Sequence, residues 1–520
     1  MTEPHYTLGE EYQNRCVKLS EIRTLGVDPY PHHFSPTHSL GTLCEKFEGK
    51  EVGHFDDAAS GNTTAVTVSG RLVLFRAMGK NAFGQIQEGS DRIQLLFSRE
   101  HTKVHGLLSE EITPLKFIEK KLDLGDFIGI TGHLFRTQKG ELTVFAKEVT
   151  LLCKALLPLP DKHAGLADKG VRYRKRWLDL IANPDSLKVL TLRSRIVELI
   201  RLCFQNRGFM EVETPVLQNV YGGAQARPFT THLHALDQEM FLRISLEIPL
   251  KKLIVGGLSK VFEMSKVFRN EGIDRTHNPE FTELEAYAAY WDYNDTMKLM
   301  EELFETLALE LFQTTKVQVE KEGQLHEIEL KAPWKRLSMK ESIKLYSKLD
   351  VDAHSDGELR AILAKKGLEE KPLAQLSRGS LIALLFEELV EHQLIQPHHI
   401  IDHPIETTPL CKLHRDKSLA EAGFVERFES FILGGEFCNA YTELNDPILQ
   451  RKLLEDQAAQ KLAGNEEANP LDEEFIEAIC QGMPPCSGIG MGIDRLVMLF
   501  TNAQSIRDVL FFPLMKPEEK

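Results

Sequence analysis

The segment VFRNEGIDRTHNPEFTELEAY, residues 267–287, alternates charged and apolar residues on either side of a polar loop. If VFRNE and FTELEAY are two strands of a hairpin, the two-residue period puts Arg269 and Glu271 on one face of the first strand. One face of the second strand then carries Phe281, Glu283, Glu285 and Tyr287. Burying such carboxylates without partners costs several kcal/mol, so this face must meet water or a charged ligand. An exposed sheet face with surface ion pairs is the alternative to a ligand site.

The composition is that of a globular protein. With 520 residues, 42% of them hydrophobic, the chain is long enough for about two to four domains. No apolar run reaches the roughly 18 residues that a membrane span needs, and the N-terminal MTEPHYTLGEEY lacks the pattern of a signal peptide. We therefore expect a cytoplasmic protein that does not enter a membrane.

Cysteine spacing and net charge narrow the range of functions. The eight cysteines form no CxxC pair and have no nearby pair of histidines, which indicates reduced thiols rather than a zinc site or a disulfide framework. A net charge of −15 argues against indiscriminate binding of nucleic acid but allows a local basic patch. Any contact with RNA must therefore be confined to a small region.

The N-terminal third divides into three segments. Residues 1–64 predict a helical extension, with one helix over about 9–25 that Gly26 stops. Residues 65–155 contain five short β-rich runs, which favour a Greek-key barrel of the oligonucleotide-binding (OB) kind, although a barrel used only for packing fits as well. Residues 156–183 predict a linker, in which the basic and aromatic cluster 172–177 is a solvated face or a phosphate contact.

The rest of the chain mixes helices and strands. A long helix is expected after Pro184, with Val189, Ile196, Ile200 and Cys203 on one face. FMEVETPVL alternates as a strand up to Pro215, and SLEIPLKKLIVGG predicts a helix. Residues from about 315 to 397 predict a charged helical insertion. Residues 398–515 return to strands, with glycine-bearing turns at ILGGEF and SGIGMGIDR.

Three segments, GFMEVETPVL, the hairpin 267–287 and GIGMGIDRLVMLF, resemble in order the signature motifs of class II aminoacyl-tRNA synthetases. Within that class, GGAQARPF, FRNEG, THNPEFTELEAY and GGEFCNAYTELND are similar to the bacterial-type lysyl-tRNA synthetases. The resemblance covers about residues 65–515 apart from the insertion. It implies an α+β protein, in which an anticodon-binding OB-fold barrel precedes a catalytic domain, 184–515, built on an antiparallel sheet flanked by helices. It also implies a homodimer formed through the first-motif helix and Pro215.

The implied reaction joins the carboxylate of lysine to the α-phosphate of ATP and then transfers the lysyl group to tRNA(Lys). Because that carboxylate is ionised at neutral pH, no general base is needed, and catalysis consists of positioning and charge neutralisation. The catalytic residues that the resemblance implies are Arg269, for the α-phosphate and the lysine carboxylate, and Arg495, for the γ-phosphate. A planar guanidinium suits such oxygens.

The resemblance also implies the remaining ATP contacts, namely Glu271, His277, Asn278, Phe281, Glu429 and Gly492. Phe281 would offer its ring to one face of adenine and Arg495 would cover the other, while His277 would be a cation near the γ-phosphate. Glu429 and Glu436 resemble carboxylates that hold Mg2+. Strand parity puts Glu436 on the wrong face for this role, so a β-bulge near 434–435 is required.

The residues that match lysine binders are Gly223, Glu247, Arg269, Glu285, Tyr287, Asn439, Tyr441 and Glu443. Glu247 would take the α-amino group, and two carboxylates with a hydroxyl, Glu285, Glu443 and Tyr287, could satisfy the three N–H donors of the ε-ammonium. The related aspartate and asparagine enzymes share the architecture, but an acidic substrate would want a cation in place of Glu443. Glu283 departs from the uncharged residue expected at its position, and its role stays open.

In the barrel, Phe83, Gln94 and Glu141 match positions that stack on anticodon bases and read them. Without the resemblance, an aromatic side chain on a barrel strand is more often part of the core. Two other functions remain open. A protein lysylase would activate lysine but should lack the barrel, and an RNA-binding relative with an inactive catalytic domain should have lost the motif arginines and the metal carboxylates.

Overall fold

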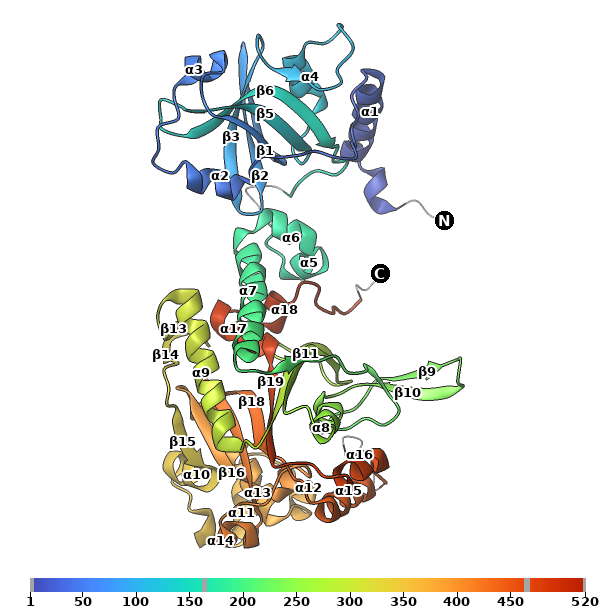
Figure 1. Ribbon diagram of the computed structural model, residues 1–520, viewed down its shortest axis with the longest axis vertical. Helices are drawn as coiled ribbons and strands as arrows, with labels where there is room; N and C mark the ends of the chain where they lie inside the picture. Colours follow the sequence, from blue (N-terminus) through green and yellow to red (C-terminus); the bar gives the residue numbers. More distant parts are fainter. Residues whose placement is uncertain (1–3, 161–165, 463–467, 518–520) are drawn as a thin grey trace. The chain divides into compact units, whose positions relative to one another are not determined.

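The computed structural model describes residues 4–160, 166–462 and 468–517, which form two compact units, 1–187 and 188–520 (Figure 1). Residues 161–165 of the expected linker lie outside the described residues. Both units mix helices and strands, so the predicted α+β class is confirmed. None of the helices in the described ranges combines the length and the apolar character that crossing a membrane requires.

The first unit is built around a barrel. Its strands are β1 (Ala65–Met78), β2 (Asn81–Glu88), β3 (Asp91–Ser98), β4 (Lys103–Val104), β5 (Phe127–Arg136) and β6 (Leu142–Cys153). They follow the order β3-β2-β1-β5-β6-β4, and a parallel pairing of β3 with β6 closes the barrel. The five long strands coincide with the five runs expected from the sequence, which confirms the OB fold. Its helices are η1 (His5–Leu8), α1 (Glu10–Thr24), α2 (Leu40–Lys46), α3 (Phe55–Ser60) and α4 (Pro114–Lys121).

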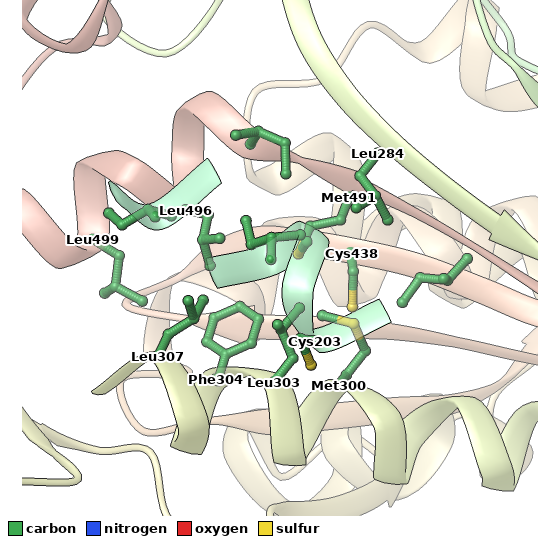
Figure 2. Packing of buried hydrophobic residues seen from close by; sticks show 14 of the residues in the cluster. Cys203, Leu284, Met300, Leu303, Phe304, Leu307, Cys438, Met491, Leu496 and Leu499 are labelled. Carbon is green, nitrogen blue, oxygen red and sulfur yellow. The ribbon is translucent and has the colours of Figure 1, made fainter. Parts of the chain in front are cut away.

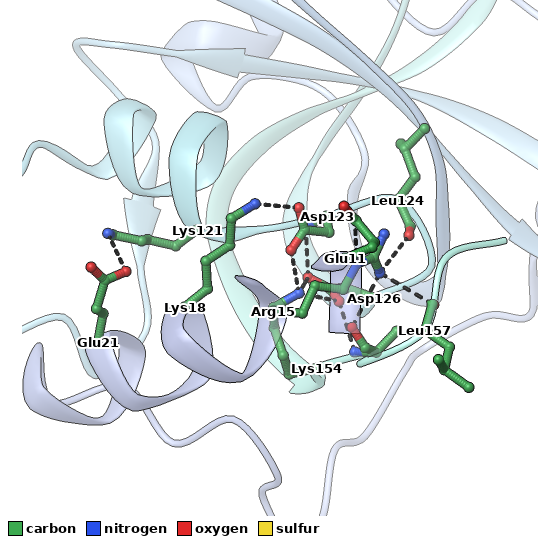
Figure 3. A network of polar contacts seen from close by, with 11 residues as sticks. Glu11, Arg15, Lys18, Glu21, Lys121, Asp123, Leu124, Asp126, Lys154 and Leu157 are labelled. Atoms are coloured by element: carbon green, nitrogen blue, oxygen red, sulfur yellow. Dashed lines mark hydrogen bonds and ion pairs between the residues drawn. The ribbon is translucent and has the colours of Figure 1, made fainter. Parts of the chain in front are cut away.

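Helix α1 ends before Gly26, as predicted, because Gly26 adopts a φ of 89° that favours glycine. A buried polar network fastens this helix to the barrel (Figure 3). Arg15 Nη1 donates to the carbonyl oxygens of Leu124 at 3.2 Å and Ala155 at 3.1 Å. Lys154 Nζ pairs with Asp126 Oδ1 at 2.9 Å, and both side chains are fully buried. The helical extension is therefore part of the same unit as the barrel.

The basic cluster 172–177 folds into two short helices, α5 (Lys169–Arg174) and α6 (Arg176–Ala182). Two of its arginines share a buried carboxylate: Arg172 Nε and Arg176 Nη1 each lie 2.7 Å from Asp179. Such paired guanidinium groups hold the two helices together. Arg176, whose side chain is 2% exposed, is therefore not part of a solvated face, while a phosphate contact by the rest of the cluster stays a prediction.

The second unit contains an eight-stranded sheet in the order β15-β16-β17-β18-β19-β12-β11-β7, which is antiparallel except at its two edges. Its strands are β7 (Met210–Glu211), β11 (Lys260–Phe268), β12 (Glu280–Ala289), β15 (Lys335–Ser338), β16 (His398–Pro404), β17 (Phe424–Ile432), β18 (Gly435–Thr442) and β19 (Cys486–Gly492). A three-stranded sheet is formed by β8 (Leu217–Gln218), β9 (Thr230–Leu233) and β10 (Gln238–Leu242).

The helices of this unit are α7 (Pro184–Asn206), α8 (Glu247–Val255), α9 (Tyr293–Phe312), α10 (Met339–Ser347), α11 (Asp356–Lys365), α12 (Glu370–Ala374), α13 (Arg378–Leu389), α14 (Lys417–Glu421), α15 (Pro447–Leu462), α16 (Glu473–Cys480), α17 (Ile493–Thr501) and α18 (Ile506–Val509), with short turns η2 (Val351–Ala353), η3 (Glu391–Gln393) and η4 (Ile405–Thr407). Helices α7 and α8 are those predicted after Pro184 and in SLEIPLKKLIVGG. The face expected for α7 is buried, with Ile196 and Ile200 in the main core.

One face of the large sheet is covered by helices (Figure 1). In Figure 2, Met300, Leu303, Phe304 and Leu307 of α9 pack with Leu496 and Leu499 of α17. From the sheet, Leu284, Cys438 and Met491 point into the same core. Because side chains alternate along a strand, the neighbours of Leu284 on β12 must project from the opposite face. That opposite face carries the candidate site.

Two strands expected from the sequence are shorter in the structure. In FMEVETPVL only Met210 and Glu211 join the sheet, because the side chain of Glu263 takes the place of a backbone acceptor for Thr214, at 2.9 Å. The strand expected at VFRNE ends at Phe268, since Asn270 N donates to Arg227 O instead of to the next strand. Arg269 and Glu271 therefore lie in a loop and not on a strand face.

SGIGMG is not a turn but forms all of strand β19 after its first residue, Cys486. Glycine is needed there because a Cβ at Gly488 would overlap the ring of Tyr287 and the carboxylate of Glu443. The segment 315–397 contains helices α10 to α13, as the sequence predicts, and their core also takes in Ile400, Phe424 and Phe431 of strands β16 and β17. It also holds the hairpin β13 (Lys316–Lys321) and β14 (Gln324–Glu329), and edge strand β15, which the helical prediction missed.

Candidate active site

A cavity of about 420 Å³ opens on the face of the large sheet opposite α9 and α17, in the second unit. Strands β12, β18 and β19 and the loop after β11 form much of its wall. The structure brings most of the sequence-predicted site residues to this wall, namely Gly223, Glu247, Arg269, Glu271, His277, Asn278, Phe281, Glu285, Tyr287, Glu429, Glu436, Asn439, Tyr441, Gly492 and Arg495. Glu443 is the exception, since it is fully buried and does not line the cavity.

The charged face of β12 is the cavity wall, which explains the alternation in FTELEAY. Phe281, Glu283, Glu285 and Tyr287 all line the cavity, whereas Leu284 belongs to the core. Arg269 approaches this face from its loop. Its guanidinium carbon lies 5.0 Å from the ring centroid of Phe281, and its Nε donates to Ile244 O at 3.1 Å. An arginine and an aromatic ring thus stand side by side on the wall.

A second arginine stands beside a histidine. Arg495 Nη2 lies 3.0 Å from His277 Nε2, and His277 Nδ1 lies 2.8 Å from Asp274 Oδ2. Because a guanidinium can only donate, Nε2 is the acceptor and the imidazole is neutral in this arrangement. This differs from the expected cation at His277. Partial burial opposes the effect, but hydrogen bonds from Thr276 N and from His277 hold the pKa of the Asp274 carboxyl well below its usual range.

Two carboxylates, Glu429 of β17 and Glu436 of β18, line the cavity together because of a β-bulge. The pairing passes from Ser430 with Cys438 to Phe431 with Glu436, so Phe437 is the extra residue. A bulge was expected near 434–435; there the chain instead makes a two-residue turn, in which Leu433 and Gly434 have φ values of 54° and 61°. The bulge returns Glu436 to the face that the cavity requires.

These two carboxylates fit a divalent cation bound together with a ligand. Burial and then the charge of Glu429 raise the pKa of the Glu436 carboxyl, so an added positive charge there would be stabilising. No group of three or more acidic, histidine or cysteine side chains suited to a metal occurs in the described ranges. Two protein carboxylates with the remaining ligands supplied by water and phosphate is an arrangement that suits Mg2+.

The opposite part of the cavity is rich in acceptors. Glu285, which is 3% exposed, accepts hydrogen bonds from Ser245 Oγ at 2.8 Å, Leu246 N at 2.7 Å and Tyr287 Oη at 2.8 Å. Burial, with the nearby charges of Glu283 and Glu247, raises the pKa of the Glu285 carboxyl to about 8. An ammonium group bound here would favour its ionised form.

Glu443 was expected to contact the ε-ammonium of the substrate, but in the structure it is paired with a cation of the protein itself. Lys251 Nζ, fully buried, forms ion pairs with both Glu247 Oε1 and Glu443 Oε2. On the cavity side of Glu247, Tyr441 Oη donates to its carboxylate at 2.7 Å. The sequence analysis missed Lys251. The available signal was its position four residues after Glu247 on a predicted helix, a spacing at which opposite charges meet.

Two further charged residues belong to the wall. Glu283, whose role was open, lines the cavity, and its Oε1 lies 3.5 Å from Arg269 Nη2. Burial raises the pKa of the Glu283 carboxyl, and Arg269 opposes this shift. Arg427, which the sequence analysis also missed, pairs with Glu429 at 2.6 Å and donates to Asn439 Oδ1 at 3.0 Å. Its alternation with Glu429 along VERFESF was the signal that could have found it.

In the first unit, the candidate anticodon residues belong to the barrel, with Phe83 on β2, Gln94 on β3 and Glu141 directly before β6. Gln94 Nε2 donates to Glu141 Oε2 at 2.9 Å, and Gln94 Oε1 accepts from Thr143 Oγ1 at 2.9 Å, which fixes the orientation of its amide. Phe83 is partly buried and packs against a small cluster that includes Leu96. The structure therefore joins Gln94 and Glu141 by a hydrogen bond and packs Phe83 partly against the barrel.

Comparisons with known proteins agree with this geometry. A family model described as tRNA synthetases class II (D, K and N) matches residues 168–516, and one described as OB-fold nucleic acid binding domain matches residues 66–152. The lysine–tRNA ligase of Chlamydia pneumoniae is 57% identical over 512 residues, which are 98% of this chain and 97% of the relative. That of Moorella thermoacetica is 44% identical over 510 residues, 97% of this chain and 98% of the relative. The chain belongs to the class II tRNA synthetases of the D, K and N group.

Proposed function

We propose that this chain is a lysine–tRNA ligase, which activates lysine with ATP to a lysyl-adenylate and transfers the lysyl group to tRNA(Lys). The observation that carries the proposal is the buried carboxylate of Glu285 on the cavity wall, which three fixed donors hold in place. An ammonium group is the ligand that such a carboxylate discriminates for, because leaving it unpaired in a dry site is costly. The names of the relatives agree with this substrate.

The arginine part of the cavity would bind ATP. Arg269 would hold the α-phosphate and the lysine carboxylate, which brings the attacking oxygen to phosphorus without a general base. Arg495 would hold the γ-phosphate, and His277 Nε2 orients its guanidinium. Phe281 would stack on adenine, with Glu271, Asn278 and Gly492 as further contacts. Catalysis is then the neutralisation of phosphate charge by preorganised donors.

Glu429 and Glu436 would hold Mg2+, which supplies positive charge to the triphosphate. Arg427 fixes Glu429 through its 2.6 Å ion pair, so this carboxylate keeps its orientation before the nucleotide arrives. The bulge at Phe437 does the same for Glu436 by setting the strand face.

The acceptor part of the cavity would bind lysine. Glu285 and Tyr287 would receive the ε-ammonium, while Glu247, with Gly223, would receive the α-ammonium. Asn439 and Tyr441 would line the path between them, and Tyr441 Oη already orients Glu247. Glu443 would act from behind Gly488 through its charge, because its carboxylate does not reach the cavity surface. Two anionic ends matched to two ammonium groups would exclude an acidic amino acid.

The remaining assignments are part of the same proposal. Residues 65–155 would read the anticodon of tRNA(Lys) through Phe83, Gln94 and Glu141, and residues 184–515 would carry the chemistry. A homodimer would form through α7 and the segment around Pro215. Exposed apolar side chains on these elements support this, namely Leu202, Met210, Val216 and Leu217. We place the enzyme in the cytoplasm.

An amino-acid panel in ATP–pyrophosphate exchange tests the proposal. Lysine alone should support exchange, aspartate and asparagine should not, and tRNA(Lys) should then accept lysine. Exchange with aspartate would overturn the substrate assignment. Failure to charge tRNA(Lys), with exchange intact, would favour a protein lysylase, although the barrel argues against one. Loss of both activities would favour an inactive RNA-binding relative. The presence of Arg269 and Arg495 on the cavity wall argues against that alternative.

A further inference from the structure

Lys251 of helix α8 is buried beside the lysine-binding part of the cavity without lining it. Its Nζ forms ion pairs with Glu247 Oε1 and Glu443 Oε2, and all three side chains are at most 5% exposed. The same Nζ lies 5.4 Å from the ring centroid of Tyr441. One internal ammonium thus connects Glu247, proposed to bind the α-ammonium of the substrate, with Glu443, proposed to act through its charge from behind Gly488.

The contacts leave Lys251 little freedom. Although burial works against its charge, the charges of Glu247 and Glu443 raise the pKa of the Lys251 ammonium above its usual range. On the other side, Tyr441 Oη reaches both carboxylate oxygens of Glu247 at 2.7 Å. Tyr441, Glu247, Lys251 and Glu443 therefore form one continuous polar chain behind the cavity wall.

This chain matters because of what happens when one member is removed. A buried ion pair contributes little net stability, but removing one partner leaves an uncompensated buried charge, which is strongly destabilising. Burial raises the pKa of the Glu443 carboxyl well above its usual range, and the charge of Lys251 opposes this shift. Without Lys251, Glu443 would keep no cation among its described ion pairs, so its protonated form would be favoured further. Glu247 would keep Tyr441 but lose the contact that fixes it from behind.

We propose that Lys251 is a positioning residue of the lysine site, whose buried ammonium holds Glu247 in place and favours the anionic form of Glu443, so that both can attract the ammonium groups of the substrate. This inference rests on the proposed function. It assigns to a residue of the protein itself the task of pre-arranging the negative charge that selects lysine. A residue that only stabilises the fold would affect lysine and ATP alike.

The test compares Lys251→Met with Lys252→Met in ATP–pyrophosphate exchange, varying lysine and ATP separately. Lys252 is the next residue of the same helix, and its ion pair with Glu474, at 3.0 Å, is on the surface. Lys251→Met should lower kcat/KM for lysine by roughly 100-fold or more, through KM, since one partner of a buried pair is lost. The KM for ATP should stay within about threefold, and Lys252→Met should change neither constant by more than about threefold. Equal losses for lysine and ATP would overturn the proposal.

A double-mutant cycle with Glu443→Gln separates charge compensation from a general defect. In the Glu443→Gln background one of the two buried carboxylates that pair with Lys251 is already neutral, so Lys251→Met should cost less than in the parent, below about tenfold in kcat/KM for lysine. A loss of more than tenfold there would overturn the proposal, and this comparison holds even if the single Lys251→Met variant does not fold. Failure of the parent enzyme to activate lysine would instead refute the proposed function, which keeps the two failures distinct.

Discussion

His277 Nε2 accepts a hydrogen bond that Arg495 donates through Nη2 over 3.0 Å, and Asp274 fixes the other nitrogen of the same ring. The relationship joins the loop after β11 to the first turn of α17, two segments more than 200 residues apart. It holds a guanidinium at the place proposed for the γ-phosphate. The histidine is therefore an orienting group for Arg495 rather than a second cation.

Replacing this histidine should weaken the binding of ATP. In His277→Ala, Arg495 loses a hydrogen bond to a charged group, a contact worth about 1.5–3 kcal/mol, so the KM for ATP should rise roughly 10- to 150-fold. Lysine constants measured at saturating ATP should barely change. His232→Ala, on the hairpin of β9 and β10, is the matched control because its exposed imidazole lies outside the cavity wall. An unchanged KM for ATP would show that His277 does not orient Arg495.

Glu285→Gln should impair the use of lysine specifically. The shape is kept but the charge is lost, and truncating one member of a buried charged contact costs about 2–5 kcal/mol, or roughly a 30- to 4000-fold fall in kcat/KM for lysine. Steady-state exchange measured above the pKa of Glu285 gives this value, and the KM for ATP serves as the internal reference. Glu280→Gln is the control, since Glu280 begins the same strand with an exposed side chain. Retention of kcat/KM within about threefold would refute the assignment of Glu285.

The raised pKa of Glu285 also predicts a pH dependence. In the free enzyme this carboxyl titrates near pH 8, so at lower pH it is protonated and a bound ammonium must displace the proton. The kcat/KM for lysine should therefore rise with pH up to about 8 and then level off. Glu285→Gln should lack this limb.

The same raised pKa has the opposite effect on the stability of the fold, which should fall as pH rises. A folded-state pKa above the unfolded value means that the native state binds more protons, so this contribution is complete below the unfolded pKa and is lost as pH rises through about 8. Chemical unfolding of the parent and of Glu285→Gln across this range checks it. The two stability profiles should differ most in slope between the unfolded pKa and about pH 8.

The place of a site residue could be predicted from the sequence where a local pattern decides it. It could not be predicted where tertiary contacts decide it. The alternation in FTELEAY was enough to put Phe281 and Glu285 on one face, because the pleat alone sets that face. The bulge could be inferred because Glu436 had to face the cavity, but its location at Phe437 depends on the two-residue turn at Leu433 and Gly434. The end of β11 could not be predicted, since Asn270 finds its acceptor on Arg227, far away in the sequence.

Glu443 shows the same limit for charge. A list of carboxylates gives the acceptors that a substrate could use, but it does not say which of them the protein has already paired. Lys251 reaches Glu443 only because α8 packs near the end of β18, which no local pattern specifies. Whether a buried charge is available to a ligand is a property of the folded chain.

Chelation of divalent cations should abolish lysine activation while leaving the fold intact. The carboxylates proposed for Mg2+, Glu429 and Glu436, are held by Arg427 and by the bulge, which are contacts within the protein and do not require the metal. Pyrophosphate exchange should therefore vanish in excess chelator and return on adding Mg2+, with an unchanged thermal unfolding curve. Exchange that survives exhaustive chelation would contradict the metal assignment.

Phe83→Ala should impair tRNA charging, to which the first unit contributes, and spare lysine activation, which we assign to the second unit. Loss of base stacking should lower kcat/KM for charging of tRNA(Lys) by about 1–3 kcal/mol, roughly 5- to 150-fold, while activation of lysine without tRNA stays unchanged, because the residues proposed for activation all lie in the second unit. Phe127→Ala is the matched control, since it removes another partly exposed ring of the same barrel, stacked by Arg71 at 4.3 Å and outside the predicted anticodon contacts. Because Phe83 also packs against the cluster of Leu96, thermal unfolding must be recorded for both variants. If charging and activation fall together, or if charging is unaffected in a folded variant, Phe83 is a packing residue of the barrel and does not stack on the anticodon.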